Sequence, residues 1–396
     1  MKISKIETVS CPTGATPALS FVRVHTDEGV SGLGETYYTP ESVAAYVHEV
    51  IAPHVLGLDP LANGSTWDNV YEQSARRGPG GTDMRALSAV DLALWDLRGK
   101  LLGVPVYVLL GGSDKPDGVR VYNTCAGSNY ASATSVGTGR SQERDDLWRA
   151  INAPAELAAE LRTQGFAGMK IWPFDAAAAE DQGRRIAPTA LRAGMEVLEA
   201  IRAEVGDKLD LMIEGHGQWQ LAAATTILRA IEPMNVRWAE DMILAHDPQT
   251  LTLLRQRTLV PLAVSEYLMG RWQYRQILQS GAVDYLHLDP SWCGGISESQ
   301  RILSVASSFG VVCAMHDCTG PVNLLAGLHL AAANRIVGYQ EVLRAFLNDV
   351  YPTMVDTQWT LEGSRLRAPS SPGLGAALSD EYLAREDLIV RASVCP

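Results

Sequence analysis

Three glutamates stand at equal intervals in the second half of the chain, and each follows a short apolar run. They are Glu214, Glu240 and Glu266, and both steps between them are 26 residues long. A repeat of about 25 residues is the length of one strand followed by one helix. Carboxylates that end successive parallel strands converge on the carboxyl face of the sheet, where barrel enzymes keep their active sites. Three hard oxygen donors without a thiolate suit Mg²⁺ better than zinc.

The same spacing continues with three further polar residues. Asp289, His316 and Glu341 follow at steps of 23, 27 and 25 residues. A carboxylate bonded to one nitrogen of a histidine fixes the tautomer and raises the basicity of the other nitrogen. Asp289 and His316 end neighbouring expected strands, which is the geometry that such a base needs. The regular series therefore indicates an enzyme.

The elements that must position these residues begin with a separate unit at the N-terminus. Alternating apolar residues with turn chemistry predict an antiparallel sheet there, and helical periodicity follows it. Strands followed by helices, ahead of the repeat, indicate an α+β unit. The expected strands cover residues 2–9, 20–26 and 30–35, and the expected helices cover 42–51, 67–73 and 82–102.

From residue 119 onward the pattern is strand, loop and helix, repeated. Strands expected over 119–123 and 168–172, with the six strand ends above, make eight strands of an α/β barrel. A long polar stretch at 127–140 is typical of a functional or mobile loop. The expected domains are residues 1–118 as the α+β unit, 119–354 as the barrel, and 355–396 as a segment that packs back on the first unit.

Composition limits the classes of partner and location. The net charge of −12 and the pI near 5.2 argue against nucleic acid and anionic membranes as partners. Six scattered cysteines without a C-x-x-C pair fit a reducing cytoplasm. The N-terminus has no apolar signal core, and no segment approaches about 18 uninterrupted apolar residues. We therefore expect neither export nor a membrane span.

Four motifs, in this order and at barrel spacing, resemble those of a known family. Residues 86–97 (ALSAVDLALWDL), with GVPVY at 103–107 and LGG at 110–112, are similar to the last helix of its capping domain. The other three are EGHG at 214–217, Asp289 with GG at 294–295, and His316 with GP at 320–321. Together they resemble the enolase superfamily, in particular the acid-sugar dehydratases of the mandelate racemase/muconate lactonizing enzyme family.

This resemblance implies a modified TIM barrel, (β/α)7-8β, under an N-terminal α+β capping domain that the C-terminal tail completes. It implies Mg²⁺ held by Glu214, Glu240 and Glu266, and a base, His316, oriented by Asp289. Removal of a proton next to a carboxylate creates an enediolate, whose negative charge a divalent ion stabilises. The family more often has Asp on the third strand, so Glu214 is a departure.

His216 lies two residues beyond Glu214, so its side chain falls on the same side if the strand continues. In related dehydratases a histidine there acts as general acid on the departing hydroxyl; the alternative is a packing or metal-adjacent histidine. Two other carboxylates are weaker candidates. Asp241 is expected to point away from its neighbouring ligand, and Asp317, expected in a loop, competes with Asp289 as partner of the base.

The second expected strand separates two reactions. Enzymes of the mandelate racemase type carry Lys-x-Lys there, which gives a base on the opposite face of the substrate. Here the motif is Lys170-Ile171-Trp172, and Trp172 cannot accept a proton, which favours one-base elimination. Lys170 is a candidate to neutralise the substrate carboxylate. Glu341 is a candidate to hydrogen-bond the substrate or to cap the following helix.

Substrate contacts are expected from the first unit and from tryptophans. The stretch RRGPGG at 76–81, which begins with Arg76, and the loop 12–17 correspond to the family's substrate-selecting cap loops. The first lacks the strand, helix and Lys-Ser/Thr of a phosphate-binding loop. Trp172 and Trp292, near expected strand ends, could stack on a sugar face, although core packing fits each equally well.

The sequence therefore predicts a cytoplasmic carbon–oxygen lyase that removes the α-proton of a sugar acid and its β-hydroxyl as water. Mg²⁺ is the expected cofactor, a small carboxylate the expected partner, and a 2-keto-3-deoxy acid the product. The alternatives are a cycloisomerase of an anhydro-sugar acid or sugar lactone, a racemase or epimerase, and a barrel that only binds a metabolite. Relatives commonly form symmetric assemblies, so a homo-oligomer is expected. Which sugar acid is used does not follow from the sequence.

Overall fold

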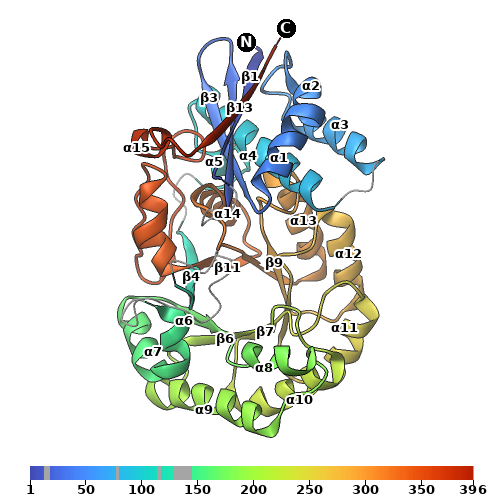
Figure 1. Cartoon of the computed structure of the whole chain (residues 1–396), viewed down its shortest axis with the longest axis vertical. Helices are drawn as coiled ribbons and strands as arrows, with labels where there is room; N and C mark the ends of the chain where they lie inside the picture. The colour runs from blue at the N-terminus through green and yellow to red at the C-terminus, as the bar shows by residue number, and fades with distance from the viewer. Residues whose placement is uncertain (13–17, 77–79, 114–116, 128–144, 396) are drawn as a thin grey trace.

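The computed structural model describes residues 1–12, 18–76, 80–113, 117–127 and 145–395. Within them the chain forms a four-stranded antiparallel sheet and a closed parallel barrel (Figure 1). The predicted α/β fold, a modified TIM barrel with an α+β capping domain, is confirmed. The domain boundaries after residues 118 and 354 stay a prediction. Parts of the expected substrate-selecting loops and most of the polar stretch lie outside the described residues, at 13–17, 77–79 and 128–144.

The capping sheet takes strands from both ends of the chain. Its order is β13, β1, β2, β3, and all three pairings are antiparallel. Figure 1 shows the two termini close together at this end of the molecule. The C-terminal tail therefore completes the sheet. The strands are β1 (Ile3–Ser10), β2 (Leu19–Thr26), β3 (Ser31–Tyr37) and β13 (Ile389–Val394).

The longest helix, α4 (Thr82–Leu102), packs directly on this sheet. A Cβ atom at Gly32 or Gly34 of β3 would collide with the α4 backbone, so glycine lets helix and strand approach. Apolar residues of α4 and β2 bury against each other in a separate capping core. The other capping helices are α1 (Pro40–Tyr46), η1 (Val47–Ile51), α2 (Ala52–Val55), α3 (Asn63–Ala75) and α5 (Val106–Leu109).

The barrel has eight parallel strands in sequence order, and the last pairs with the first. The pairing of β11 with β4 closes it, and a short antiparallel strand, β12 (Arg365–Leu366), extends β4. The expected count of eight is confirmed. The strands are β4 (Val119–Thr124), β5 (Gly168–Ile171), β6 (Asp210–Glu214), β7 (Trp238–Glu240), β8 (Leu262–Val264), β9 (Tyr285–Leu288), β10 (Val312–Met315) and β11 (Val337–Val342).

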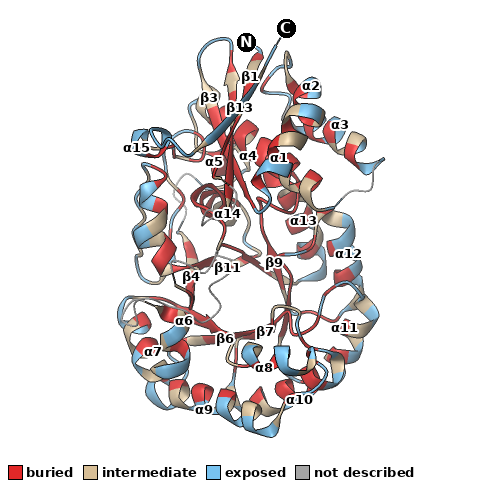
Figure 2. Cartoon of the chain, in the orientation of Figure 1, coloured by how far each residue is buried: buried red, intermediate tan, exposed pale blue. Residues whose placement is uncertain are grey.

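Helices surround the strands, and Figure 2 shows their buried faces turned inward and their exposed faces outward. None of the helices in the described residues is long and apolar enough to cross a membrane. The α-helices after the capping domain are α6 (Asp146–Asn152), α7 (Pro154–Thr163), α8 (Asp175–Ala178), α9 (Pro188–Val205), α10 (Leu221–Ile231), α11 (Pro248–Arg255), α12 (Gly270–Ser280), α13 (Gly295–Phe309), α14 (Pro321–Ala333) and α15 (Asp380–Leu383). Short helical turns are η2 (Ala179–Asp181), η3 (Glu232–Met234), η4 (Phe346–Val350) and η5 (Tyr351–Thr353).

The capping domain binds the barrel through the starts of α13 and α14. Asp91 of α4 accepts hydrogen bonds from the backbone N–H and hydroxyl of Ser297 at 2.9 and 2.7 Å. Glu35 of β3 accepts from the backbone N–H groups of Val322 and Asn323 at 3.0 and 2.7 Å. Carboxylates are stabilised at helix N-termini. Since α13 and α14 follow the carboxyl ends of β9 and β10, these contacts hold the cap over that end of the barrel.

Candidate active site

Lys170 of β5 lies among carboxylates at the carboxyl ends of the strands. Its ammonium is 3.0 Å from an oxygen of each of Glu214, Glu240 and Glu341. The register aligns Glu214 with Glu240, so β6 and β7 end level. Burial disfavours the ammonium, but Glu240 and Glu341 outweigh that cost and raise the pKa of Lys170 well above its usual value. Lys170 is therefore a fixed cation that joins three strand ends.

Two of the predicted ligands gather with a histidine that the sequence did not single out. Donor atoms of Glu240, Glu266 and His287 lie within 4.8 Å of one another, and all three residues are buried. Oxygen Oε2 of Glu266 is buried and has no hydrogen-bond partner among the described residues. Such an oxygen is costly unless a donor or a cation reaches it. Carboxylates are hard donors, so these residues fit a divalent cation.

Glu214, the third predicted ligand, is not part of that grouping. Its Oε2 contacts Lys170, and its Oε1 accepts the backbone N–H of His216 at 3.0 Å. Asp241 was expected on the opposite face, but β7 ends one residue earlier and Asp241 has a φ of 40°. Burial, followed by the charge of Glu266, raises the pKa of Asp241 well above its usual value. Its carboxyl group therefore joins the negative cluster that a cation would offset.

His316 and Asp289 form the expected pair. Parallel pairing of β10 with β9 places them side by side, and Nδ1 of His316 lies 2.7 Å from Oδ2 of Asp289. Burial opposes the charged imidazole, but Glu341 and then Asp289 raise the pKa of His316 to about 10. The competing carboxylate, Asp317, instead accepts a hydrogen bond from the Tyr351 hydroxyl at 2.6 Å. The geometry favours Asp289 as the partner.

His216 has a carboxylate partner that the sequence analysis missed. Strand β6 ends at Glu214, and His216 stands in the following turn with a φ of 46°. Its Nδ1 lies 2.5 Å from Oδ2 of Asp175, the first residue of α8. Burial opposes the charged ring, but Glu214 and Asp175 raise the pKa of His216 to about 9. The only available signal was the place of Asp175 shortly after the second barrel strand.

The predicted substrate-contact residues are not all in one place. The Trp172 ring packs edge-on against His216 at 5.2 Å, and the Trp292 ring lies 5.1 Å from the ring of His316. Arg76 is exposed where α3 ends. A different arginine, Arg85 of α4, lies over Trp292 with its guanidinium carbon 4.2 Å from the ring. The sequence missed Arg85 because a helix interior gives no sign of what its side chains face.

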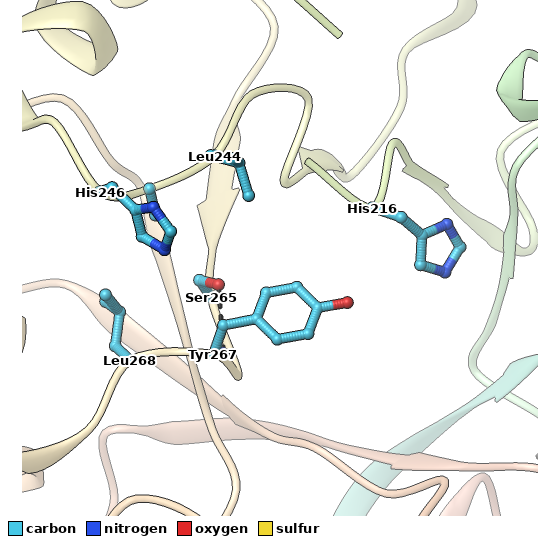
Figure 3. A pocket seen from close by; sticks show the side chains of 7 residues that line it. His216, Leu244, His246, Ser265, Tyr267 and Leu268 are labelled. Carbon is cyan, nitrogen blue, oxygen red and sulfur yellow. Dashed lines mark hydrogen bonds between the residues drawn. The ribbon is translucent and has the colours of Figure 1, made fainter. Parts of the chain in front are cut away.

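A pocket of about 270 Å³ lies beside the carboxyl ends of β6, β7 and β8. Figure 3 shows the hydroxyl of Tyr267 directed toward His216 across this space. The pocket therefore gives a small molecule room next to the His216–Asp175 pair. Its lining residues are His216, Leu244, Ala245, His246, Ser265, Tyr267 and Leu268.

Two family models match the chain and cover most of it. Residues 5–111 match the mandelate racemase/muconate lactonizing enzyme N-terminal domain, and residues 153–382 match the enolase C-terminal domain-like family. Members of this family are generally metal-dependent, which agrees with the carboxylate and histidine grouping of the barrel.

Curated relatives match over nearly the whole length. A D-galactonate dehydratase of Ralstonia nicotianae is 30% identical over 393 residues, which cover 98% of this chain and 94% of the relative. A D-mannonate dehydratase of Novosphingobium aromaticivorans is 30% identical over 379 residues, covering 93% and 92%. Dehydratases are carbon–oxygen lyases, so these relatives confirm the predicted enzyme class.

Solved structures agree with the fold. A mandelate racemase subgroup enolase from Agrobacterium tumefaciens is 37% identical, with a TM-score of 0.86 and coverage of 100% of this chain and 99% of the other. An enolase protein from Sargasso Sea environmental sequence is 34% identical, with a TM-score of 0.88 and full coverage of both chains. The chain thus belongs to the mandelate racemase/muconate lactonizing enzyme family of the enolase superfamily.

Proposed function

We propose that this protein is a Mg²⁺-dependent acid-sugar dehydratase. It removes the proton on the carbon next to a sugar-acid carboxylate and expels the β-hydroxyl as water. The resulting enol tautomerises to a 2-keto-3-deoxy acid. One observation carries the proposal: two histidine–carboxylate pairs flank the glutamate cluster from opposite sides of the barrel. His316 follows β10 and His216 follows β6, and these strands are four places apart in a ring of eight.

His316 is assigned as the base. Asp289 engages its Nδ1, so Nε2 is the nitrogen left to accept the α-proton. Nε2 lies 3.9 Å from Glu341, whose carboxylate also contacts Lys170. The surrounding carboxylates, Glu341 first, raise the pKa of His316, and a cation held by the glutamates would offset part of their charge, so that the ring could be neutral before it takes the proton. A positioned base of this kind contributes about 10²- to 10⁴-fold to the rate.

Glu240 and Glu266, with Glu214, are the residues that would hold the cation. The unsatisfied oxygen of Glu266 and the hard donors support Mg²⁺. When bound, Mg²⁺ supplies positive charge that stabilises the negative charge developing on the substrate carboxylate. His287 lies 2.7 Å from Glu240 and restricts how that carboxylate can turn.

His216 is assigned as the acid that protonates the departing hydroxyl. Asp175 holds its Nδ1, which leaves Nε2 to deliver the proton. As the carbon–oxygen bond breaks, the oxygen takes this proton and leaves as water, while the electrons of the α-carbon form the new double bond. The α-proton remains on His316 until it returns to solvent.

Lys170 and Trp172 favour elimination over racemisation. The Lys170 ammonium is shared by three protein carboxylates, which supports a role in holding them in place. Trp172 stands where racemases of this family carry a second base, and it packs against His216. The chain therefore lacks the second base that racemases of this family use on the opposite face of the α-carbon.

The relatives are named for galactonate and mannonate, which are sugar acids and support the same substrate class. A cytoplasmic location and a homo-oligomer stay predictions from the sequence.

The test is turnover of a panel of aldonic and aldaric acids by the purified protein, with Mg²⁺ or with a chelator. Products are trapped by semicarbazide, which reports 2-keto acids. We expect Mg²⁺-dependent product from one stereochemical series. No product from any acid, with the metal bound, would refute the dehydratase assignment.

A matched pair of variants separates the metal site from general damage. Glu240→Gln should abolish both turnover and the rise in melting temperature that Mg²⁺ causes, because binding to the folded state alone stabilises it. Glu204→Gln, on the exposed face of α9, should change neither. Unchanged metal response in the Glu240 variant would contradict the ligand set.

A further inference from the structure

Arg85 is a cation that has no counter-ion among the described residues. It belongs to α4 of the capping domain, and its Nη1 donates to the backbone oxygen of Tyr37 at 2.9 Å. No carboxylate of the described residues lies within 4.0 Å of its guanidinium. Burial lowers the pKa of Arg85, and the charge of Asp289 opposes that shift. An arginine desolvated in this way is normally paired.

The ring beneath Arg85 also has an unused donor. Trp292 is 3% exposed, and its indole Nε1–H is buried with no acceptor among the described residues. Trp292 lies between the guanidinium of Arg85 and the proposed base, because its ring is in contact with both Arg85 and His316. Tyr38 and Tyr267 both lie near Trp292, with ring centroids 5.8 and 6.3 Å from that of Trp292. A guanidinium without a carboxylate partner among the described residues and one unsatisfied donor thus stand next to the reaction site.

The backbone that carries Tyr38 is strained. Tyr38 and Thr39, where β3 gives way to α1, have φ values of 67° and 46°. Residues with a side chain rarely adopt this conformation, and such strain collects at functional sites. It places the Tyr38 ring 5.2 Å from the Arg85 guanidinium.

Two buried or partly buried cations of the barrel have carboxylate partners. Lys170 contacts three carboxylates, and Arg344 contacts Asp146 and Glu160 at 2.5 and 2.6 Å. Arg85 differs because its guanidinium lies over the rings of Tyr38 and Trp292, and Trp292 lies next to His316. An anion bound at the site would supply the partner that the described residues do not.

We propose that Arg85 and the indole N–H of Trp292 bind the second carboxylate of a dicarboxylic sugar acid, so that the substrate is an aldaric acid rather than an aldonic acid. This inference rests on the proposed function, which uses the first carboxylate at the glutamate cluster. A planar guanidinium fits a carboxylate through two parallel hydrogen bonds. The neutral hydroxymethyl end of an aldonic acid would leave Arg85 unpaired.

The experiment compares paired acids of one configuration: galactarate with galactonate, glucarate with gluconate, and mannarate with mannonate. Binding is measured by calorimetry on the Mg²⁺-loaded protein in a His316→Asn background, which prevents turnover. Turnover is measured separately with the His316 enzyme. We expect one aldaric acid to bind more tightly than its aldonic partner. Arg85→Met, which keeps the packing on Trp292, should weaken binding of the aldaric acid about 10- to 100-fold and leave binding of the aldonic acid unchanged.

Two variants control for folding. Arg98→Met lies on the same helix, about 20 Å away, and removes a guanidinium that is likewise half-buried and lies 5.3 Å from the ring of Trp95. It should leave the preference unchanged. Arg85→Lys keeps the charge but loses the planar fork, so it should show a smaller loss than Arg85→Met and remains informative if the methionine variant does not fold.

The outcomes separate this inference from the proposed function. An Arg85-dependent preference for an aldaric acid, without any 2-keto acid product, would refute the dehydratase and keep the subsite. Mg²⁺-dependent product with no preference, or with one unchanged in Arg85→Met, would refute the subsite and keep the dehydratase. Failure of every aldaric acid to bind also overturns the subsite. Tighter binding of 6-phosphogluconate than of glucarate would show a phosphate site and overturn the carboxylate assignment.

Discussion

The amino end and the carboxyl end of the barrel both bury charged side chains, and they satisfy them differently. At the amino end, Asp210 begins β6 and accepts hydrogen bonds from Arg237 at 2.6 Å, Arg120 at 3.1 Å and the Tyr339 hydroxyl at 2.8 Å. Both carboxylate oxygens therefore have partners. Charges at this end belong to the structure and require nothing from solution.

At the carboxyl end the carboxylates exceed their partners. Lys170 contacts three of them, while Asp241, Glu266 and Asp317 each keep a buried oxygen without a hydrogen-bond partner among the described residues. Unsatisfied buried charge costs stability, and a chain retains it where a ligand completes it. The contrast teaches that buried carboxylate oxygens without hydrogen-bond partners, more than the presence of charge, mark the reactive end of the barrel.

The largest expected effect comes from the base. His316→Asn should lower turnover by about 10⁴-fold, because the α-proton then has no acceptor. Exchange of that proton with D₂O, followed by NMR, should be lost while Mg²⁺ binding persists. His25→Asn is the matched control, since His25 also lies near a carboxylate, Glu7 at 3.7 Å, but on β2 of the cap. Retained exchange in the His316 variant would remove it from the role of base.

A smaller loss is expected at the second pair. Asp175→Asn should slow water loss about 100-fold, because His216 loses the group that orients it. Exchange of the α-proton should fall much less, since it depends on His316. The ratio of exchange to elimination is the readout, and Asp181→Asn in the adjacent turn should leave it at the wild-type value. An equal fall in both rates would mean that Asp175 only supports the structure.

The amino end should respond in stability and not in catalysis. Asp210→Asn leaves two arginines without their carboxylate and should reduce the free energy of unfolding by about 2 to 3 kcal/mol, less than for a fully buried pair because the arginines are partly exposed. Denaturant unfolding measures this loss, and kcat should stay within about twofold of wild type because the site is untouched. Asp207→Asn, an exposed neighbour, should be neutral in both measurements. Loss of activity without loss of stability in the Asp210 variant would break the contrast.

Spacing alone predicted the positions that parallel strands determine. Glu214, Glu240, Asp289 and His316 end strands or follow them directly, and Glu341 is the next-to-last residue of β11. A strand-plus-helix repeat brings such positions to one face. The eight-strand barrel followed from the same spacing, and the cap from the alternating and helical patterns ahead of it. These features depend on local pattern, which a sequence carries.

Residues placed by loops or by the other domain were not predictable. Asp175 reaches His216 through a short helix after β5, and Arg85 reaches Trp292 because α4 packs across the cap. Neither contact produces a regular spacing of residues that could be recognised in the sequence. His287 was missed for another reason: it lies inside β9, where alternation predicts only that one of two faces points inward.

A buried histidine away from both ends of the barrel tests the same contrast, between buried groups with and without hydrogen-bond partners, in a single residue. His329 of α14 accepts the backbone N–H of Tyr107 at 3.1 Å through Nδ1, and its Nε2 donates to the oxygen of Leu374 at 3.1 Å. The ring is thus neutral and satisfied, and burial lowers its pKa from 6.5 to about 4. A histidine whose pKa is lowered by folding contributes its full stability at pH values above its pKa in the unfolded chain. That contribution is lost as the pH falls from about 6.5 to about 4.

The free energy of unfolding of the wild type, relative to His329→Gln, should therefore fall by about 2 kcal/mol between pH 7 and pH 5. Urea unfolding at pH 7, 6 and 5 measures this difference. His54→Gln, on the exposed face of α2, should track the wild type at all three values. A constant difference between wild type and His329→Gln would show that the ring does not resist protonation, and that satisfaction by two backbone groups is not what keeps it neutral.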